Sequence, residues 1–187
     1  VSSNFIRKRN FENRTTGNWG GQGIIEDLGS LKAINGMTKA FKWATRNAFE
    51  EGNVIDVSPG ETYYVEFVVN TFYAKYPVRF GLNTYGPLGE NVGFNVMIEA
   101  PSGQPTQKVT GTITIPTTGA NTPYTKARPL LQINGPNGSD LGYAYVTALA
   151  ISPNANNSQI TQLEKNINLR VKEGDVLSQI NIEAEQT

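Results

Sequence analysis

The sequence predicts an antiparallel β-sandwich or barrel, because from Glu61 onward short apolar runs alternate with turn signals. The clearest strand is predicted at 62–70, directly after a Ser-Pro-Gly turn. There, apolar residues that can face a core alternate with residues that face the other way. In the run 109–115, Val, Gly and Ile alternate with threonine until Pro116, which is typical of a half-buried strand.

The other predicted strands are shorter or less regular. Val78, Phe80 and Leu82 continue the alternation, with Arg79 and Asn83 on the opposite side. Further strands are predicted at 5–11, 24–28, 40–45, 94–98, 129–134 and 143–151. The sequence therefore predicts an all-β domain that begins near the N-terminus and ends close to residue 152.

The composition excludes several classes of function. The 187 residues include no His and no Cys, and 16 basic residues balance 16 acidic ones. Without imidazole or thiol, the chain cannot form the usual zinc sites, a cysteine nucleophile or a histidine-based triad. The balanced charge argues against a nucleic-acid partner. We expect no membrane span, since no run approaches roughly 18 apolar residues, and we expect no signal peptide.

Carboxylates are the general acid–base groups that remain. The neighbours Glu26 and Asp27, like Glu50 and Glu51, would point to opposite faces of a strand, and we interpret both pairs as solvated surface. Glu66 lies in the middle of a strand, opposite the predicted core. It could belong to a polar row on one sheet face with Asn70, Arg79, Asn83, Gln132 and Asn134. A wet outer face explains the same pattern, and we predict that the protein is not an enzyme.

Several aromatic residues lie in predicted turns, where the strand pattern gives them no place in a core. Flat rings flanked by Asn, Gln and Arg suit the apolar face and hydroxyl edge of a sugar, although turn tyrosines can equally cap the ends of a sandwich. Trp43 alternates with Phe41, which favours a core position, and it is retained as a candidate. The candidate saccharide-binding residues are Trp43, Glu66, Tyr73, Tyr76, Arg79, Tyr85, Tyr124 and Gln132.

The composition changes after the last predicted strand. Residues 152–157 read Ser-Pro-Asn-Ala-Asn-Asn, which is typical of a linker, and Ser158 can cap a following helix. Ile160, Leu163 and Ile167 then recur at the spacing of a coiled coil. Farther on, the apolar pattern shifts towards a period of two.

Three motifs occur in an order that is known from one family. Residues 4–12, with Gly17 and Trp19, are similar to an opening pattern Asn-Leu-x-x-Asn-x-x-Phe-Glu followed by Gly and Trp. Residues 59–63 match Pro-Gly-x-x-Tyr, and residues 111–116 match Gly-Thr-Ile-Thr-Ile-Pro. In this order the chain resembles the jelly-roll carbohydrate-binding modules of the family 4/9 type over about residues 4–152. The resemblance implies a jelly roll that binds saccharide.

The same resemblance implies a structural calcium ion, for which Glu12 is the candidate ligand. Members of the family often carry an Asp on the last strand, where this sequence has Val146, Thr147 and Ala148. No other cofactor is expected.

The C-terminal segment carries a second resemblance. The sequence at 163–165, 168–176 and 178–181 is similar to a connector in tail proteins of phages that infect Gram-positive bacteria, where it commonly precedes trimeric fibre segments. We therefore divide the chain into a jelly-roll module at 1–152 and a linker with a helical, trimerising connector at 153–187.

Together the two resemblances imply a phage tail protein that binds host cell-wall or surface saccharide and so mediates host adhesion. Its expected partners are bacterial cell-wall polysaccharide, other phage tail proteins and, through the connector, two further copies of the chain. It would reside in the virion after assembly in the bacterial cytoplasm. The alternative is a structural module that decorates the tail or assists assembly and has no ligand of its own.

Overall fold

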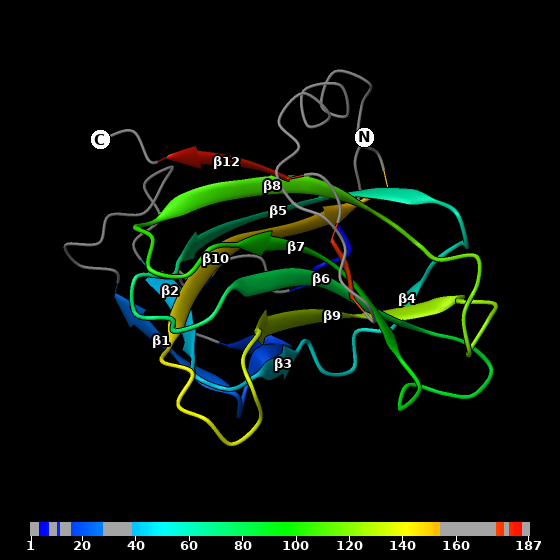
Figure 1. Ribbon diagram of the computed structural model, residues 1–187, viewed down its shortest axis with the longest axis horizontal. Helices are drawn as coiled ribbons and strands as arrows, with labels where there is room; N and C mark the ends of the chain where they lie inside the picture. Colours follow the sequence, from blue (N-terminus) through cyan, green and yellow to red (C-terminus); the bar gives the residue numbers. More distant parts are fainter. Residues whose placement is uncertain are drawn as a thin grey trace.

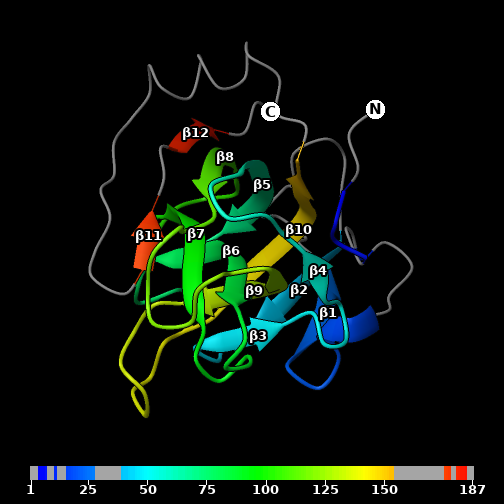
Figure 2. The same cartoon turned by 90° about the vertical axis from the view of Figure 1, so that its right-hand side faces the viewer.

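The computed structural model describes residues 4–7, 11, 16–27, 39–153, 175–177 and 180–184. Within these ranges the chain forms β-strands and one short 3-10 helix, η1 (Gly17–Trp19), and the strands make two sheets that pack face to face (Figures 1 and 2). No helix in the described ranges is long and apolar enough to cross a membrane.

The first sheet has the strand order β1-β2-β10-β5-β8-β12. Its strands are β1 (Gly23–Asp27), β2 (Lys39–Trp43), β10 (Ala144–Ser152), β5 (Thr62–Asn70), β8 (Gln107–Thr114) and β12 (Ile180–Ala184). The second sheet has the order β11-β7-β6-β9-β3, and β4 also pairs with β9. Its strands are β11 (Asp175–Leu177), β7 (Phe94–Ala100), β6 (Val78–Tyr85), β9 (Lys126–Ile133), β3 (Asn47–Phe49) and β4 (Ile55–Asp56).

The strand order confirms the predicted jelly roll. Four strands of each sheet, β2-β10-β5-β8 and β3-β9-β6-β7, follow the arrangement of an eight-stranded jelly roll, because the chain repeatedly crosses from one sheet to the other. Among the described strands, the pairings are antiparallel except that of β11 with β7.

The predicted strand at 62–70 coincides with β5, and most of the other predicted strands agree to within a few residues. The strand predicted at 5–11 is wrong for its described residues, which lie outside the ladders. Instead, Asn4 fixes this segment against β10. Its amide Nδ2 donates to Leu149 O at 3.0 Å, and its Oδ1 accepts from Ile151 N at 3.1 Å.

The core lies between the two sheets. The inward positions of β5, including Val65 and Phe67, are buried as the alternation predicts. Phe67 meets Phe80 of the opposite sheet, with 5.5 Å between ring centroids. Nearer the N-terminus, Trp19 packs against Phe41 in the same core. The core therefore contains aromatic side chains from segments that are far apart in the sequence.

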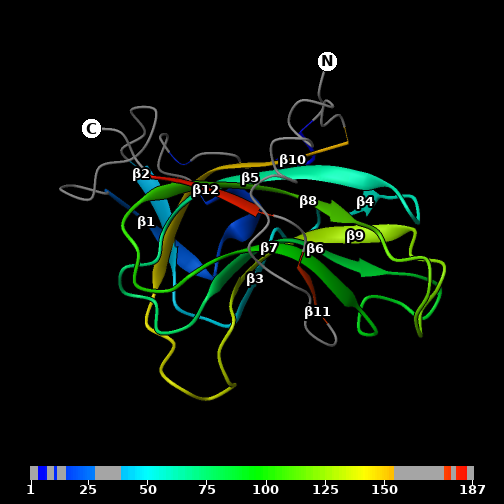
Figure 3. The ribbon, with the colours of Figure 1, turned by 45° about the horizontal axis from the view of Figure 1, so that its top comes forward.

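The last described strands extend one edge of each sheet (Figure 3). β12 pairs with β8, and β11 pairs in parallel with β7. The strand at 180–184 agrees with the period of two in the sequence. The predicted helix after Ser158 lies outside the described residues, so the helical connector and the division near residue 152 stay predictions.

Candidate functional site

The outer face of the second sheet brings together two predicted binding residues, Arg79 of β6 and Gln132 of β9. They lie directly opposite each other in the register of the two strands. The same line continues to Asn47 of β3 on one side and Glu99 of β7 on the other. Directly opposed residues project to the same side of a sheet. These four side chains therefore form a polar row across four strands.

The polar row contains a buried amide oxygen, Gln132 Oε1, that lacks a hydrogen-bond partner among the described residues. Arg79 Nε donates to Glu99 Oε1 at 2.8 Å, and Gln132 Nε2 donates to Asn47 Oδ1 at 2.9 Å. Gln132 is 1% exposed, yet its Oε1 accepts no hydrogen bond from the described part of the chain. An unsatisfied buried acceptor costs about 1–3 kcal/mol. A ligand hydroxyl that donates to Gln132 Oε1 would remove this cost.

An apolar row lies next to the polar row. Phe49 of β3 is opposite Leu130 of β9, which is opposite Gly81 of β6, and Gly81 is opposite Met97 of β7. A Cβ atom on Gly81 would lie 2.2 Å from Val96 O, so this position requires glycine. Leu130, Gly81 and Met97 are buried, and Phe49 is the half-buried member of the row.

A second polar row lies on the other side of the apolar row. Arg128 Nε donates to Asn83 Oδ1 at 3.2 Å, and Asn83 Nδ2 donates to Asn95 Oδ1 at 2.8 Å. The Arg128 guanidinium also lies 3.8 Å from the centre of the Phe49 ring and 3.6 Å from a carboxylate oxygen of Glu90. Two polar rows thus flank an apolar strip, which matches the apolar faces and hydroxyl edges of a sugar ring.

The accessible part of this face lies over β3 and β9. Asn47 is exposed, and Phe49 and Arg128 are half-buried, whereas Arg79 and Gln132 are buried. We call Asn47, Phe49, Arg128 and Gln132 the β3–β9 edge. The buried Gln132 amide donates to Asn47, the exposed member of this edge.

The structure does not bring Glu66 into this face. Glu66 is on β5 of the first sheet, where its carboxylate lies 3.1 Å from Lys108 Nζ and accepts from the Tyr64 hydroxyl at 3.4 Å. The predicted single polar row that joined Glu66 and Asn70 to Arg79 is wrong, because β5 and β6 belong to different sheets. Their outward residues therefore lie on opposite sides of the sandwich.

Trp43 and Tyr124 are buried, at 1% and 2% exposure. Trp43 stacks on Phe41, with 6.1 Å between ring centroids and an interplanar angle of 13°. Tyr124 packs against Phe94 at one end of the sandwich. Both rings pack among core residues, and the binding role predicted for them stays a prediction. Trp43 is a core residue, as its alternation with Phe41 favours, and Tyr124 caps the sandwich.

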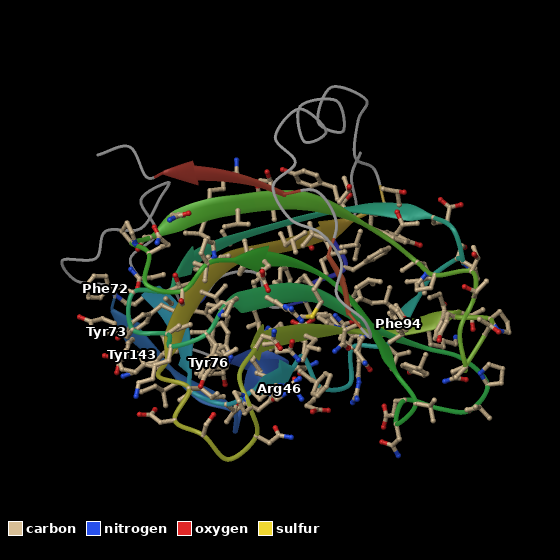
Figure 4. The ribbon with its side chains drawn as sticks, in the orientation of Figure 1. Arg46, Phe72, Tyr73, Tyr76, Phe94 and Tyr143 are labelled. Atoms are coloured by element: carbon tan, nitrogen blue, oxygen red, sulfur yellow. The ribbon has the colours of Figure 1, made fainter. Side chains whose placement is uncertain are left out.

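The other predicted tyrosines lie nearer the surface. Tyr76 is half-buried and packs against the core, beside Gly135. Tyr85, the last residue of β6, is also half-buried. Tyr73 is exposed at the end of the molecule opposite Phe94 (Figure 4). A ligand role for these three residues stays a prediction.

Tyr73 belongs to a group of rings that sequence reasoning identified only in part. Its ring stacks on Tyr143, with 4.9 Å between centroids and an angle of 20°, and meets Phe72 edge to face at 5.0 Å. Tyr143 meets Tyr145 edge to face at 5.8 Å. We call Phe72, Tyr73, Tyr143 and Tyr145 the aromatic cluster. The alternation within 143–151 could have identified Tyr145 as an outward residue.

The hydroxyl of Tyr145 donates to Glu26 Oε2 at 3.0 Å. Burial of the ring, and then the hydrogen bond and charge of Glu26, raise the pKa of Tyr145 from 10.0 to about 12. Because the folded-state pKa lies above the unfolded value, the protonated phenol stabilises the fold fully below pH 10. This contribution is lost as the pH rises towards 12.

We expect Glu26→Gln to lower the pKa of Tyr145, since the substitution removes the acceptor's negative charge. Phenolate absorbance during a pH titration measures this change, and Tyr145→Phe identifies which step belongs to Tyr145. A Tyr145 step that does not move in Glu26→Gln would show that the carboxylate does not govern this hydroxyl.

One predicted surface carboxylate proves to be internal. Glu50 is fully buried, its Oε1 accepts from Arg7 N at 3.0 Å, and Asn53 Nδ2 also donates to this oxygen. The interpretation of Glu50 as solvated surface is therefore wrong, because protein donors replace water around it. Among the described residues, no group of three or more acidic side chains could hold a metal ion. Glu12, the predicted calcium ligand, lies outside them.

At low sequence identity the chain is similar to several solved structures. No protein-family model matches the chain, and no curated protein sequence matches it. One similar solved structure is the CBM22-2 xylan-binding domain of Paenibacillus barcinonensis Xyn10C, at 15% identity over 77% of this chain and 96% of that one, with a TM-score of 0.43. A second is the carbohydrate-binding module CBM6cm-2 of Cellvibrio mixtus lichenase 5A with cellotriose, at 11% identity over 76% and 96%, with a TM-score of 0.43.

A third is the N-terminal cellulose-binding domain of Cellulomonas fimi β-1,4-glucanase C, at 17% identity over 66% of this chain and 84% of that one, with a TM-score of 0.42. At this level of similarity, the function has to be argued from the residues of this chain. Its own strand order and outer face define a jelly-roll β-sandwich with an apolar strip between two polar rows.

Proposed function

We propose that the protein binds saccharide without cleaving it, and that the β3–β9 edge contacts the sugar. The observation that carries this proposal is the buried Gln132 Oε1, which lacks a donor among the described residues and lies beside the exposed Asn47. A sugar offers hydroxyl donors and apolar C–H faces within one ring, so it can donate to the amide oxygen and also stack on Phe49, the half-buried member of the apolar row.

The side chains of the β3–β9 edge have complementary tasks. Phe49 offers a ring to the C–H face of the sugar, although the Arg128 guanidinium already covers one side of that ring at 3.8 Å. The Asn47 amide and the Arg128 guanidinium can donate to sugar oxygens, while Gln132 Oε1 accepts from a hydroxyl. Because each contact is a neutral hydrogen bond, a stacking contact or a cation–dipole contact, the affinity of one site should be modest.

The carboxylates of this face support binding rather than catalysis. Glycoside hydrolysis uses two carboxyl groups that flank one glycosidic bond. Glu99 is paired with Arg79 at 2.8 Å, and Glu90 lies 3.6 Å from an Arg128 nitrogen. Paired in this way, neither is placed as a free acid or base in the described part of the face.

The wider role rests on the sequence. The resemblance of the C-terminal segment to phage tail connectors supports a module that attaches a phage tail to host cell-wall or surface saccharide. A trimer formed through that segment would offset modest affinity per site, because linked sites bind with a high effective concentration.

Gln132→Leu tests the site. We expect binding to weaken about tenfold, equivalent to about 1.4 kcal/mol, because the substitution leaves a sugar hydroxyl without its acceptor. The free energy of unfolding should fall only by the contribution of the lost hydrogen bond to Asn47, because the substitution also removes the unsatisfied oxygen. Calorimetric titration with oligosaccharides released from Gram-positive cell-wall polysaccharide measures the affinity, and thermal unfolding measures the stability.

Gln107→Leu is the matched control. Gln107 is also buried and its Oε1 also lacks a partner among the described residues, but it lies on β8 of the other sheet. This variant should bind like the wild type. Equal weakening in both variants would contradict a specific role for Gln132, and a wild-type protein that binds no saccharide would favour the structural alternative.

A further inference from the structure

We propose that the aromatic cluster is a second saccharide-binding site, which holds an uncharged pyranose ring by stacking. It lies at the end of the sandwich where β10 of the first sheet begins, and Tyr145 projects from the outer face of that sheet. The inference takes its ligand class from the proposed function, but it depends on different residues and on the opposite side of the molecule.

The cluster presents apolar rings to solvent. Phe72 is 57% exposed and Tyr73 is 43% exposed, and Figure 4 shows both beside Tyr143 at one end of the molecule. Adjacent exposed aromatic side chains leave apolar surface in water, which is unfavourable unless a ligand covers it. Stacking of Tyr73 on Tyr143 holds the ring of Tyr73 in one orientation. The exposed rings of Phe72 and Tyr73 therefore form a preorganised surface on which a sugar ring can stack.

The backbone that carries the exposed rings is fixed before any ligand binds. Asn70 Oδ1 accepts from Phe72 N at 3.1 Å, and Asn70 Nδ2 donates to Thr106 Oγ1 at 3.1 Å. This side chain links the loop after β5 to the segment before β8. Less conformational freedom is then lost on binding, which favours affinity.

A second set of contacts fixes Tyr73 against the loop before β10. Tyr143 N donates to Tyr73 O at 3.3 Å. Gly142 adopts φ +71°, and a Cβ atom there would lie 2.1 Å from Tyr73 O, so only glycine allows this approach. Lys75 N also donates to Leu141 O at 3.0 Å. The two loops thus form one platform that holds the stacked pair.

The charges around the cluster favour an uncharged ligand. Lys42 Nζ lies 4.2 Å from the centre of the Tyr143 ring and 3.4 Å from Glu26 Oε1. In the neighbouring loops, Lys75 Nζ lies 2.5 Å from Asp140 Oδ2. Each of these two lysines is paired with a carboxylate. Neither an anionic nor a cationic ligand would therefore find an unpaired opposite charge at these two pairs. Aromatic rings without net charge suit the C–H face of a neutral sugar.

The surface available to a ligand is limited to the exposed rings. Tyr145 is buried, as are Ala40 and Asn70 beside it on the outer face of the first sheet. Tyr145 therefore supports Tyr143 from below, and a sugar ring would lie on Phe72 and Tyr73.

The two proposed sites lie on the outer sides of different sheets. The β3–β9 edge faces outward from the second sheet, and Tyr145 of the aromatic cluster faces outward from the first. One module could therefore contact two polysaccharide strands, or two segments of one strand, at once. Such a module would cross-link long polysaccharide, with an avidity that neither site provides alone.

The double variant Phe72→Ala/Tyr73→Ala tests the second site. Its side chains are exposed, so the fold should persist, and Leu88→Ala is the matched control because Leu88 is 64% exposed in a loop outside both sites. Titration with oligosaccharides released from Gram-positive cell-wall polysaccharide should give two sites per wild-type chain. The double variant should keep only the β3–β9 edge, with unchanged affinity. Gln132→Leu should weaken binding at the β3–β9 edge and leave binding at the aromatic cluster unchanged.

The outcomes separate the two proposals. Wild-type stoichiometry and affinity in Phe72→Ala/Tyr73→Ala, together with weaker binding in Gln132→Leu, would overturn the second site and leave the proposed function intact. Loss of binding only in the double variant would support the aromatic cluster and contradict the β3–β9 edge. A wild-type protein that associates with itself, and an aromatic double variant that does not, would show that the rings contact a second copy of the chain, which overturns the inference.

Discussion

Trp43→Ala is expected to lower the free energy of unfolding by about 3–5 kcal/mol, the usual cost of truncating a buried large aromatic residue to alanine. Trp43 is 1% exposed and stacks on Phe41 within the core. Removal of its ring leaves a cavity that the surrounding strands cannot fill completely. Urea-induced unfolding at equilibrium measures the loss.

Trp43→Phe keeps an aromatic ring but removes the polar Nε1 atom, so it measures the two contributions separately. Trp43 Nε1 is buried and lacks a hydrogen-bond partner in the described part of the chain, so its removal relieves a desolvation cost. We expect this relief to offset part of the lost ring area, which leaves Trp43→Phe much closer to the wild type than Trp43→Ala. Leu88→Ala, on an exposed loop, should leave stability nearly unchanged.

These variants also decide between the two interpretations that the sequence allows for Trp43. A core residue loses stability on truncation, whereas a sugar-stacking residue on the surface loses affinity with little change in stability. Normal unfolding of Trp43→Ala combined with lost saccharide binding would contradict the core assignment.

The strand pattern predicts much of the fold, because alternation is a local property. Alternate residues face the core as their period predicts, namely Tyr63, Val65, Phe67 and Val69 of β5 and Val78, Phe80 and Leu82 of β6. Alternation shows which residues share one side of a strand, but it does not show which sheet the strand joins. Glu66 and Arg79 illustrate the difference: both face outward, yet from opposite sheets, because the chain crosses between the sheets after β5.

The candidate site is predicted in part for the same reason. Gln132 and Arg79 are outward residues of long strands, so their alternation identifies them. The sequence does not identify Asn47 as a site residue, because β3 has only three residues, too few for a recognisable period. Its contact with Gln132 joins positions 85 residues apart and depends on the antiparallel register of β3 and β9, which only the folded chain establishes. Trp43 is the opposite case: the sequence retains it as a binding candidate, whereas the structure buries it in the core. An aromatic side chain suits a core and a sugar-stacking surface equally, so the sequence alone does not separate the two roles.

Arg79→Met is expected to lower the free energy of unfolding by about 3–5 kcal/mol, because removal of one partner leaves the other charge buried. Arg79 is fully buried and Glu99 is 8% exposed, with 2.8 Å between Arg79 Nε and Glu99 Oε1. Replacement of both partners, in Arg79→Met/Glu99→Leu, should restore most of this stability, since well-packed apolar pairs often equal a buried ion pair. Equilibrium unfolding of the two variants and the wild type measures the difference.

Saccharide binding by the double variant then shows what the ion pair contributes to the outer face. If the β3–β9 edge makes the contacts, Arg79→Met/Glu99→Leu should bind nearly as tightly as the wild type, because the pair supports the sheet beneath the ligand without touching it. Loss of binding in a stable double variant would mean instead that the sugar reaches across the whole polar row to β7. The ligand would then extend over four strands, and Arg79 would be a direct contact, as its position in the sequence pattern predicts.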